Sequence, residues 1–195
     1  QLRWYIPEDK IDEIMDSVHH VLCLDSSNAV GRDANALVLL DIRDMSVTAT
    51  CNVTEANLYG YAKWLAHFMV RYTKTTLIIE NKSSGQSILD IMASVFDGLG
   101  IDIFARVYSQ IVDNHLTSPV EYDAICESIH TRKEEVYLAY KGKLGFMTTG
   151  KSRAFLYDAV LDEATKSSGH LINDKGISTE IKGLITKNGR VDHKV

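Results

Sequence analysis

The sequence of 195 residues predicts one α/β domain, a mixed sheet of strands with helices packed against it. Three observations predict this class: early apolar runs of strand length, one alternating segment, and helix-period stripes between the later strands. The chain is 45% hydrophobic with only two prolines, which excludes a disordered protein. No window holds ~18 consecutive apolar residues, so we expect no membrane partner.

The first three strands follow a short lead-in segment over residues 1–17, which itself contains a short helix. Val21–Asp25 and Ala36–Leu40 are short apolar runs, as in buried strands. Residues 46–53 alternate between apolar and polar side chains, as in a half-exposed strand. Because short links join them, the three strands are predicted to form an antiparallel meander.

Helices connect the remaining strands. Apolar residues recur at helical spacing over 58–69, with Thr54 as the predicted N-cap, and again over 88–99. Strands are predicted at 75–80 and 101–107, and right-handed crossovers make them parallel to each other. Two further helices are expected at residues 153–164 and 177–185.

Two acids stand at the ends of predicted strands, Asp25 after the first and Glu80 after the fourth. If these strands pair in parallel, both carboxylates emerge at one edge of strands ~5 Å apart. Ligands of α/β sheets gather at such carboxyl ends, and carboxylate oxygens bind divalent cations. The alternative is that both acids are solvated or cap the following helices.

Charge and cysteine content narrow the classes of function. The net charge of −5 excludes a protein that coats nucleic acid through basic residues. It does not exclude an enzyme that meets phosphates through bound cations. Cys23, Cys51 and Cys126 are odd in number and far apart, which argues against disulfides and zinc knuckles and indicates a reduced, cytoplasmic protein.

Four segments carry a family resemblance. They are the strand and loop from Asp25 to Asp33, the run Leu-Ile-Ile-Glu-Asn-Lys-Ser-Ser-Gly over 77–85, and the segments 169–174 and 180–193. In order and spacing they resemble the nuclease domain of the large terminase subunits of tailed bacteriophages. The resemblance covers residues 18–195 and implies a ribonuclease H-like fold without its last helix.

The resemblance implies a metal-dependent endonuclease that cleaves concatemeric double-stranded DNA during genome packaging. Asp25 would bridge two divalent cations, Mg²⁺ or Mn²⁺, and Glu80 would bind one of them. Asp33 is an auxiliary candidate ligand. The third acid of the family is expected beyond Val195, with Asp192 as its alternative, so a longer chain should be a more active nuclease.

The implied partners are duplex DNA, a packaging ATPase domain on the same polypeptide, the portal and the small terminase subunit. The implied location is the cytoplasm of the host cell, outside the finished virion. Contacts to the DNA backbone are expected from basic residues near the loops. These are Lys82, Lys141, Lys143, Lys151 and Arg153.

Two other functions stay open. Gly145–Ser152 satisfies the phosphate-binding loop pattern G-x-x-x-x-G-K-[ST] after an apolar run, as in a nucleotide-binding phosphotransferase. Against it, the sequence after Ser152 is too short for the sheet that completes such a domain, and no later strand ends in an acid that would hold magnesium. A catalytically silent module for DNA docking or assembly is the second alternative.

Overall fold

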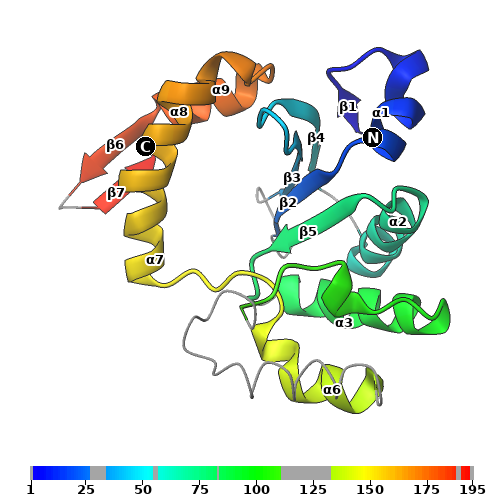
Figure 1. The fold of residues 1–195 in the computed structure, drawn as a ribbon. Helices are drawn as coiled ribbons and strands as arrows, with labels where there is room; N and C mark the ends of the chain where they lie inside the picture. The colour runs from blue at the N-terminus through cyan, green and yellow to red at the C-terminus, as the bar shows by residue number, and fades with distance from the viewer. Residues whose placement is uncertain are drawn as a thin grey trace.

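The computed structural model describes residues 2–26, 34–54, 57–82, 84–110, 133–187 and 190–193. Its centre is a five-stranded mixed sheet with helices packed against it, so the predicted α/β class is confirmed (Figure 1). None of the helices in these ranges is long and apolar enough to cross a membrane.

The sheet has the strand order β1-β4-β3-β2-β5. The central strands β2, β3 and β4 form the predicted antiparallel meander, β1 pairs antiparallel with β4, and β5 pairs in parallel with β2. The strands are β1 (Arg3–Trp4), β2 (His20–Asp25), β3 (Asn35–Asp41), β4 (Val47–Val53) and β5 (Thr75–Ile79).

Helices join and follow the strands, and a separate two-stranded sheet of β6 and β7 lies near the end of the chain (Figure 1). The helices are α1 (Ile11–Ser17), α2 (Leu58–Arg71), α3 (Ser84–Gly98), α6 (Lys133–Tyr140), α7 (Gly150–Phe155), α8 (Asp162–Ser168) and α9 (Lys175–Lys182), with a π-helix (Leu156–Leu161) between α7 and α8; the hairpin strands are β6 (Leu184–Lys187) and β7 (Arg190–His193).

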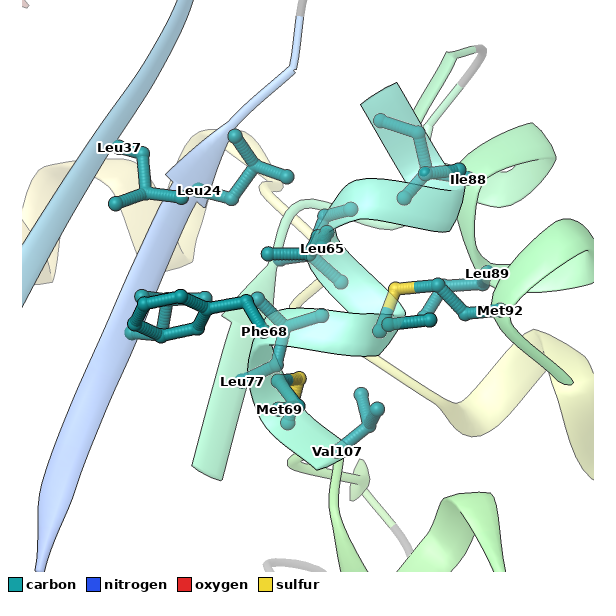
Figure 2. Close-up of a cluster of buried hydrophobic side chains, with 14 of the residues drawn as sticks. Leu24, Leu37, Leu65, Phe68, Met69, Leu77, Ile88, Leu89, Met92 and Val107 are labelled. Carbon is teal, nitrogen blue, oxygen red and sulfur yellow. The ribbon is translucent and has the colours of Figure 1, made fainter. Parts of the chain in front are cut away.

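The core lies between the sheet and the helices α2 and α3 (Figure 2). Leu24 of β2 and Leu77 of β5 meet Leu65 of α2 in this layer, all fully or almost fully buried. The intervening residues of β2, Val21 and Cys23, are only partly buried. The two apolar runs predicted as fully buried strands therefore bury one face more deeply than the other, because α2 and α3 pack on one side.

Two local predictions are wrong. Residues 101–107 do not form a strand, since the side chain of Asp102 accepts a hydrogen bond from the backbone N–H of Phe104 and starts a 3₁₀ helix. Val107 alone reaches Leu77, in an isolated parallel bridge. The N-cap of α2 is Asn57 rather than Thr54, because the Asn57 side chain accepts from the N–H groups at the helix start.

The ends of the chain differ most from the prediction. The lead-in contains the predicted helix, α1, but it also adds the edge strand β1 to the sheet. Residues 153–164 are helical through α7, the π-helix and α8, whereas the helix predicted over 177–185 is α9 and ends at Lys182. Gly183 follows, and the chain then turns into the hairpin of β6 and β7.

Candidate functional site

Asp25 and Glu80 lie at the same edge of the central sheet. In the parallel register of β2 and β5, Leu24 is paired with Ile79, and each acid is the next residue along its chain. Parallel neighbours are ~5 Å apart, so the two carboxylates leave adjacent strand ends in the same direction. The structure thus places at adjacent strand ends the two acids that the sequence indicates as the main candidate ligands.

The electrostatics of Asp25 reflect this neighbour. Partial burial of its carboxyl group raises the pKa of Asp25, and the negative charge of Glu80 raises it further. On the other side, the ammonium of Lys82 lies 3.1 Å from a carboxylate oxygen of Glu80. The site therefore holds two acids of like charge, one of which is paired with an exposed lysine.

The N-terminus of α3 packs tightly against the same edge. A Cβ on Gly85 would lie 1.9 Å from the backbone oxygen of Glu80, so only glycine permits this approach. The hydroxyl of Ser84 donates to the hydroxyl of Ser26, 3.3 Å away, which links the start of α3 to the residue after Asp25. The run from Glu80 to Gly85 therefore fixes how the two strand ends meet.

A distant segment returns to the other side of β5. The backbone N–H of Phe146 donates to the oxygen of Ile79 at 2.7 Å, and that of Asn81 donates to the oxygen of Phe146 at 2.8 Å. The side-chain amide of Asn81 also donates to the backbone oxygens of Lys141 and Leu144, at 3.2 and 2.6 Å. The turn 141–143 is therefore attached next to Glu80.

Gly145 is the residue that permits this return. Its φ of +75° lies in the left-handed region, and a Cβ there would lie 2.6 Å from the backbone oxygen of Ile79. Neither Asn81 nor Gly145 is predicted from the sequence to be part of the acidic site. Their partners are separated from them by some sixty residues, so no local pattern indicates the contacts.

The basic candidates have different surroundings. Lys143 is exposed, whereas the ammonium of Lys141 lies 3.4 Å from Asp90 of α3. Arg153 is exposed on α7, with its guanidinium 5.5 Å from the centre of the Tyr157 ring. Lys151 also lies on α7, but its side chain is outside the described part of the structure. Lys82 and the turn 141–143 are thus the basic elements attached beside Glu80.

For the two remaining acidic candidates, the structure gives no side-chain position relative to Asp25 and Glu80. Asp33 lies outside the described residues. Asp192 lies on β7, paired with Ile185 in the separate hairpin, and its side chain is also outside the description. Among the described residues, no group of three His, Cys, Asp or Glu side chains is arranged to hold a metal ion. The predicted auxiliary ligands therefore remain predictions.

The phosphate-loop pattern has a structural role. The apolar run before it is the helix α6 rather than a strand. Thr149 caps α7, and its Oγ1 accepts from the N–H of Ser152 while the Ser152 hydroxyl accepts from the N–H of Thr149. The hydroxyl that would bind Mg²⁺ in a nucleotide site is thus part of a capping box, and the described residues 133–143 before the loop form a helix and a 3₁₀ turn instead of the strand that such a loop follows.

Comparison with known proteins gives matches among solved structures. No protein-family model matches the sequence, and no curated protein matches it. The chain is similar to the large terminase nuclease from thermophilic phage G20c, with 13% identity and a TM-score of 0.43 over 91% of this chain and 73% of that one. The structure of the same nuclease with bound magnesium matches with 14% identity and a TM-score of 0.40, over 98% of this chain and 75% of that one. The structure with bound zinc matches with 15% identity and a TM-score of 0.38, over 89% of this chain and 77% of that one.

Proposed function

We propose that this chain is a metal-dependent nuclease domain that hydrolyses phosphodiester bonds of double-stranded viral DNA during genome packaging. The observation that carries the proposal is the placement of Asp25 and Glu80 at the ends of neighbouring parallel strands. The four segments that resemble terminase nucleases support the same activity, since two of them contain these acids.

The residues at this edge fit a divalent cation in ligand chemistry and in charge. Both side chains offer carboxylate oxygens, the ligands that Mg²⁺ and Mn²⁺ prefer. Partial burial and, after it, the charge of Glu80 raise the pKa of Asp25, and a bound cation would offset both by stabilising the ionised carboxylate. When bound, a pair of such cations supplies an activated water and stabilises the leaving oxygen.

The chain's own residues have separate tasks in this proposal. Asp25 and Glu80 hold the cations, with Asp33 and Asp192 as candidate further ligands. Lys82 and the turn bearing Lys141 and Lys143 contact the DNA backbone, because Asn81 fixes that turn beside Glu80. Lys151 and Arg153 on α7 would extend the contact along the duplex. Phosphate contacts of this kind imply low sequence specificity.

The same proposal includes the setting of the reaction. The domain would act with a packaging ATPase domain, the portal and the small terminase subunit, in the cytoplasm of the infected cell. These partners follow from the sequence resemblance to terminases, and DNA binding follows from the basic turn beside the acids.

Nicking of supercoiled plasmid in Mn²⁺ tests the activity. We expect Asp25→Asn and Glu80→Gln each to lower the rate by at least about a hundredfold, because each removes a charged ligand. Asp97→Asn, an exposed acid on α3, is the matched control and should cut at the rate of the unmodified chain.

Isothermal calorimetry with Mn²⁺ alone supplies a second measurement that does not depend on cleavage. The heat of binding should disappear in the Asp25 and Glu80 variants and remain in the control. Retarded migration of DNA without cutting, unchanged by the two substitutions, would contradict the enzyme and identify a DNA-docking module instead.

A further inference from the structure

The ammonium of Lys82 lies directly against the acidic edge. It is 3.1 Å from Oε1 of Glu80, whose side chain is 30% exposed, while the lysine side chain itself is 55% exposed. Among the described residues, no other acid lies within ion-pair distance of Lys82. The lysine thus places its positive charge on a carboxylate that the proposed nuclease needs for a cation.

The backbone of Lys82 is held on both sides, although its side chain is exposed. Its N–H donates to the backbone oxygen of Glu80 at 3.0 Å, and its own oxygen accepts from the N–H of Gly85 at 2.8 Å. The preceding residue, Asn81, is fixed to Leu144 through its side-chain amide. A flexible stem of four carbons therefore carries the ammonium from a fixed base. The ammonium is free to change partners, whereas the backbone is not.

The ion pair between Lys82 and Glu80 is of a kind that exchanges readily. Exposed ion pairs are screened by solvent and are weak. A divalent cation carries twice the charge of an ammonium and binds several carboxylate oxygens at once, so it displaces the lysine from Glu80. Once bound, the cation repels the ammonium, because both carry positive charge. The ammonium then requires another negative partner.

The two lysines of the turn 141–143 are engaged differently. The ammonium of Lys141 lies 3.4 Å from Asp90, which also accepts from the hydroxyl of Tyr137 at 2.7 Å, so this lysine is held against α3. Lys143 is exposed on the same turn, and none of the described ion pairs includes it. Of the three lysines, only Lys82 therefore has its charge paired with a proposed metal ligand.

We propose that Lys82 is an exchangeable counter-ion that couples cation binding to DNA binding. In the metal-free protein its ammonium neutralises Glu80, and when Glu80 ligates a divalent cation the ammonium moves to a phosphate of the DNA backbone. The inference rests on the proposed nuclease function and adds a regulation of the same site. Because linkage is reciprocal, bound DNA also strengthens cation binding. The duplex is thus bound most tightly when the site holds its cations.

Fluorescence anisotropy of a short labelled DNA duplex measures this coupling. The probe cation is Ca²⁺, which takes oxygen ligands as Mg²⁺ does, and EDTA gives the metal-free reference. Lys82→Met should weaken DNA binding at least about threefold more in Ca²⁺ than in EDTA, because only the released ammonium contacts a phosphate. Lys143→Met, with the same change of net charge, should weaken DNA binding equally in both. Lys82→Arg should keep the coupling.

A second measurement needs no metal. Glu80→Gln removes the carboxylate that holds the ammonium, so Lys82 is free in EDTA. In that background, Lys82→Met should weaken DNA binding at least about threefold more than in the unmodified chain, and the slope of log affinity against log salt should be smaller by about 1. Lys143→Met should cost the same affinity in both backgrounds. Both lysine side chains are exposed, so these variants should fold.

Calorimetry with Ca²⁺ separates this inference from the proposed function. Without DNA, Lys82→Met should tighten Ca²⁺ binding by about threefold and Lys143→Met by less, since only Lys82 must be displaced. Equal effects of the two substitutions on DNA binding, or no loss of affinity from Lys82→Met, would overturn the exchange and leave the nuclease in place. A chain that neither binds Ca²⁺ nor nicks plasmid would overturn both.

Discussion

At each end of β2 an acidic side chain lies beside an ionisable group of a neighbouring segment, and the two acids have pKa values shifted in opposite directions. At the amino end, His20 is paired with Asp41 of β3, and Arg43 donates to both oxygens of Asp41 through bonds of 2.6 to 3.1 Å. At the carboxyl end, Asp25 stands beside Glu80, which follows β5.

The pKa values of Asp41 and Asp25 are shifted in opposite directions by these neighbours. Hydrogen bonds from Arg43 lower the pKa of the nearly buried Asp41, whereas burial and the charge of Glu80 raise the pKa of Asp25. At the amino end, Asp41 is thus paired with an arginine of opposite charge, and its bonds to Arg43 hold the turn after β3 in place. The carboxyl end keeps two like charges together at a cost in stability, an arrangement typical of sites that bind or react.

The largest expected effect is on the packing of the acidic end. Gly85→Ala should destabilise the protein by at least about 2 kcal/mol, because the new Cβ meets the backbone oxygen of Glu80. Gly60→Ala in α2 is the control, since nothing lies within 4 Å of its Cβ, and it should stabilise slightly. Urea denaturation measures both, and equal stability of the two variants would refute the close approach.

The paired end should respond next. Arg43→Ala removes the side-chain partner of the nearly buried Asp41 and should cost about 1–3 kcal/mol of unfolding free energy. Arg71→Ala removes an arginine whose partners Asp12 and Asp16 are exposed, and it should cost less than about 1 kcal/mol. Thermal melts compare the two. Plasmid nicking should survive both substitutions, because neither residue lies at the acidic end.

The smallest effect has the opposite sign. Because the folded pKa of Asp25 is raised, its ionised form is disfavoured by folding, and the resulting loss of stability sets in as pH rises above about 4. Asp25→Asn should therefore stabilise the metal-free protein at pH 7, by less than about 1 kcal/mol because solvent screens the site. The gain should vanish near pH 3. Denaturation at both pH values is the measurement, and destabilisation by Asp25→Asn at pH 7 would contradict the raised pKa of Asp25.

Much of the fold could be predicted because local patterns specify it. The apolar runs of β2 and β3, the alternation of β4 and the stripes of α2 and α3 are all found where the sequence placed them. Residues 101–107 show the limit, since an apolar segment of that length fits either a strand or a short helical turn. Here the hydrogen bond from the backbone N–H of Phe104 to the Asp102 side chain favours the 3₁₀ turn.

The site could be predicted in part. Asp25 and Glu80 were recognisable because each ends an apolar strand. Asn81 and Gly145 were not recognised, although they attach the turn bearing Lys141 beside Glu80. A glycine or an asparagine in a loop has many uses, and its partner becomes visible only when the distant segment is in place.

The sequence by itself determined which residues form the strands and helices and which acids stand at strand ends, because these follow from side-chain periodicity along a short stretch of chain. Only the tertiary structure decided that β5 lies parallel to β2 in a register that joins the two acids, that Gly85 lets α3 approach them, and that residues 144–146 return beside β5. These are contacts between distant segments, and they form only where packing of the whole core makes up for the entropy of closing long loops.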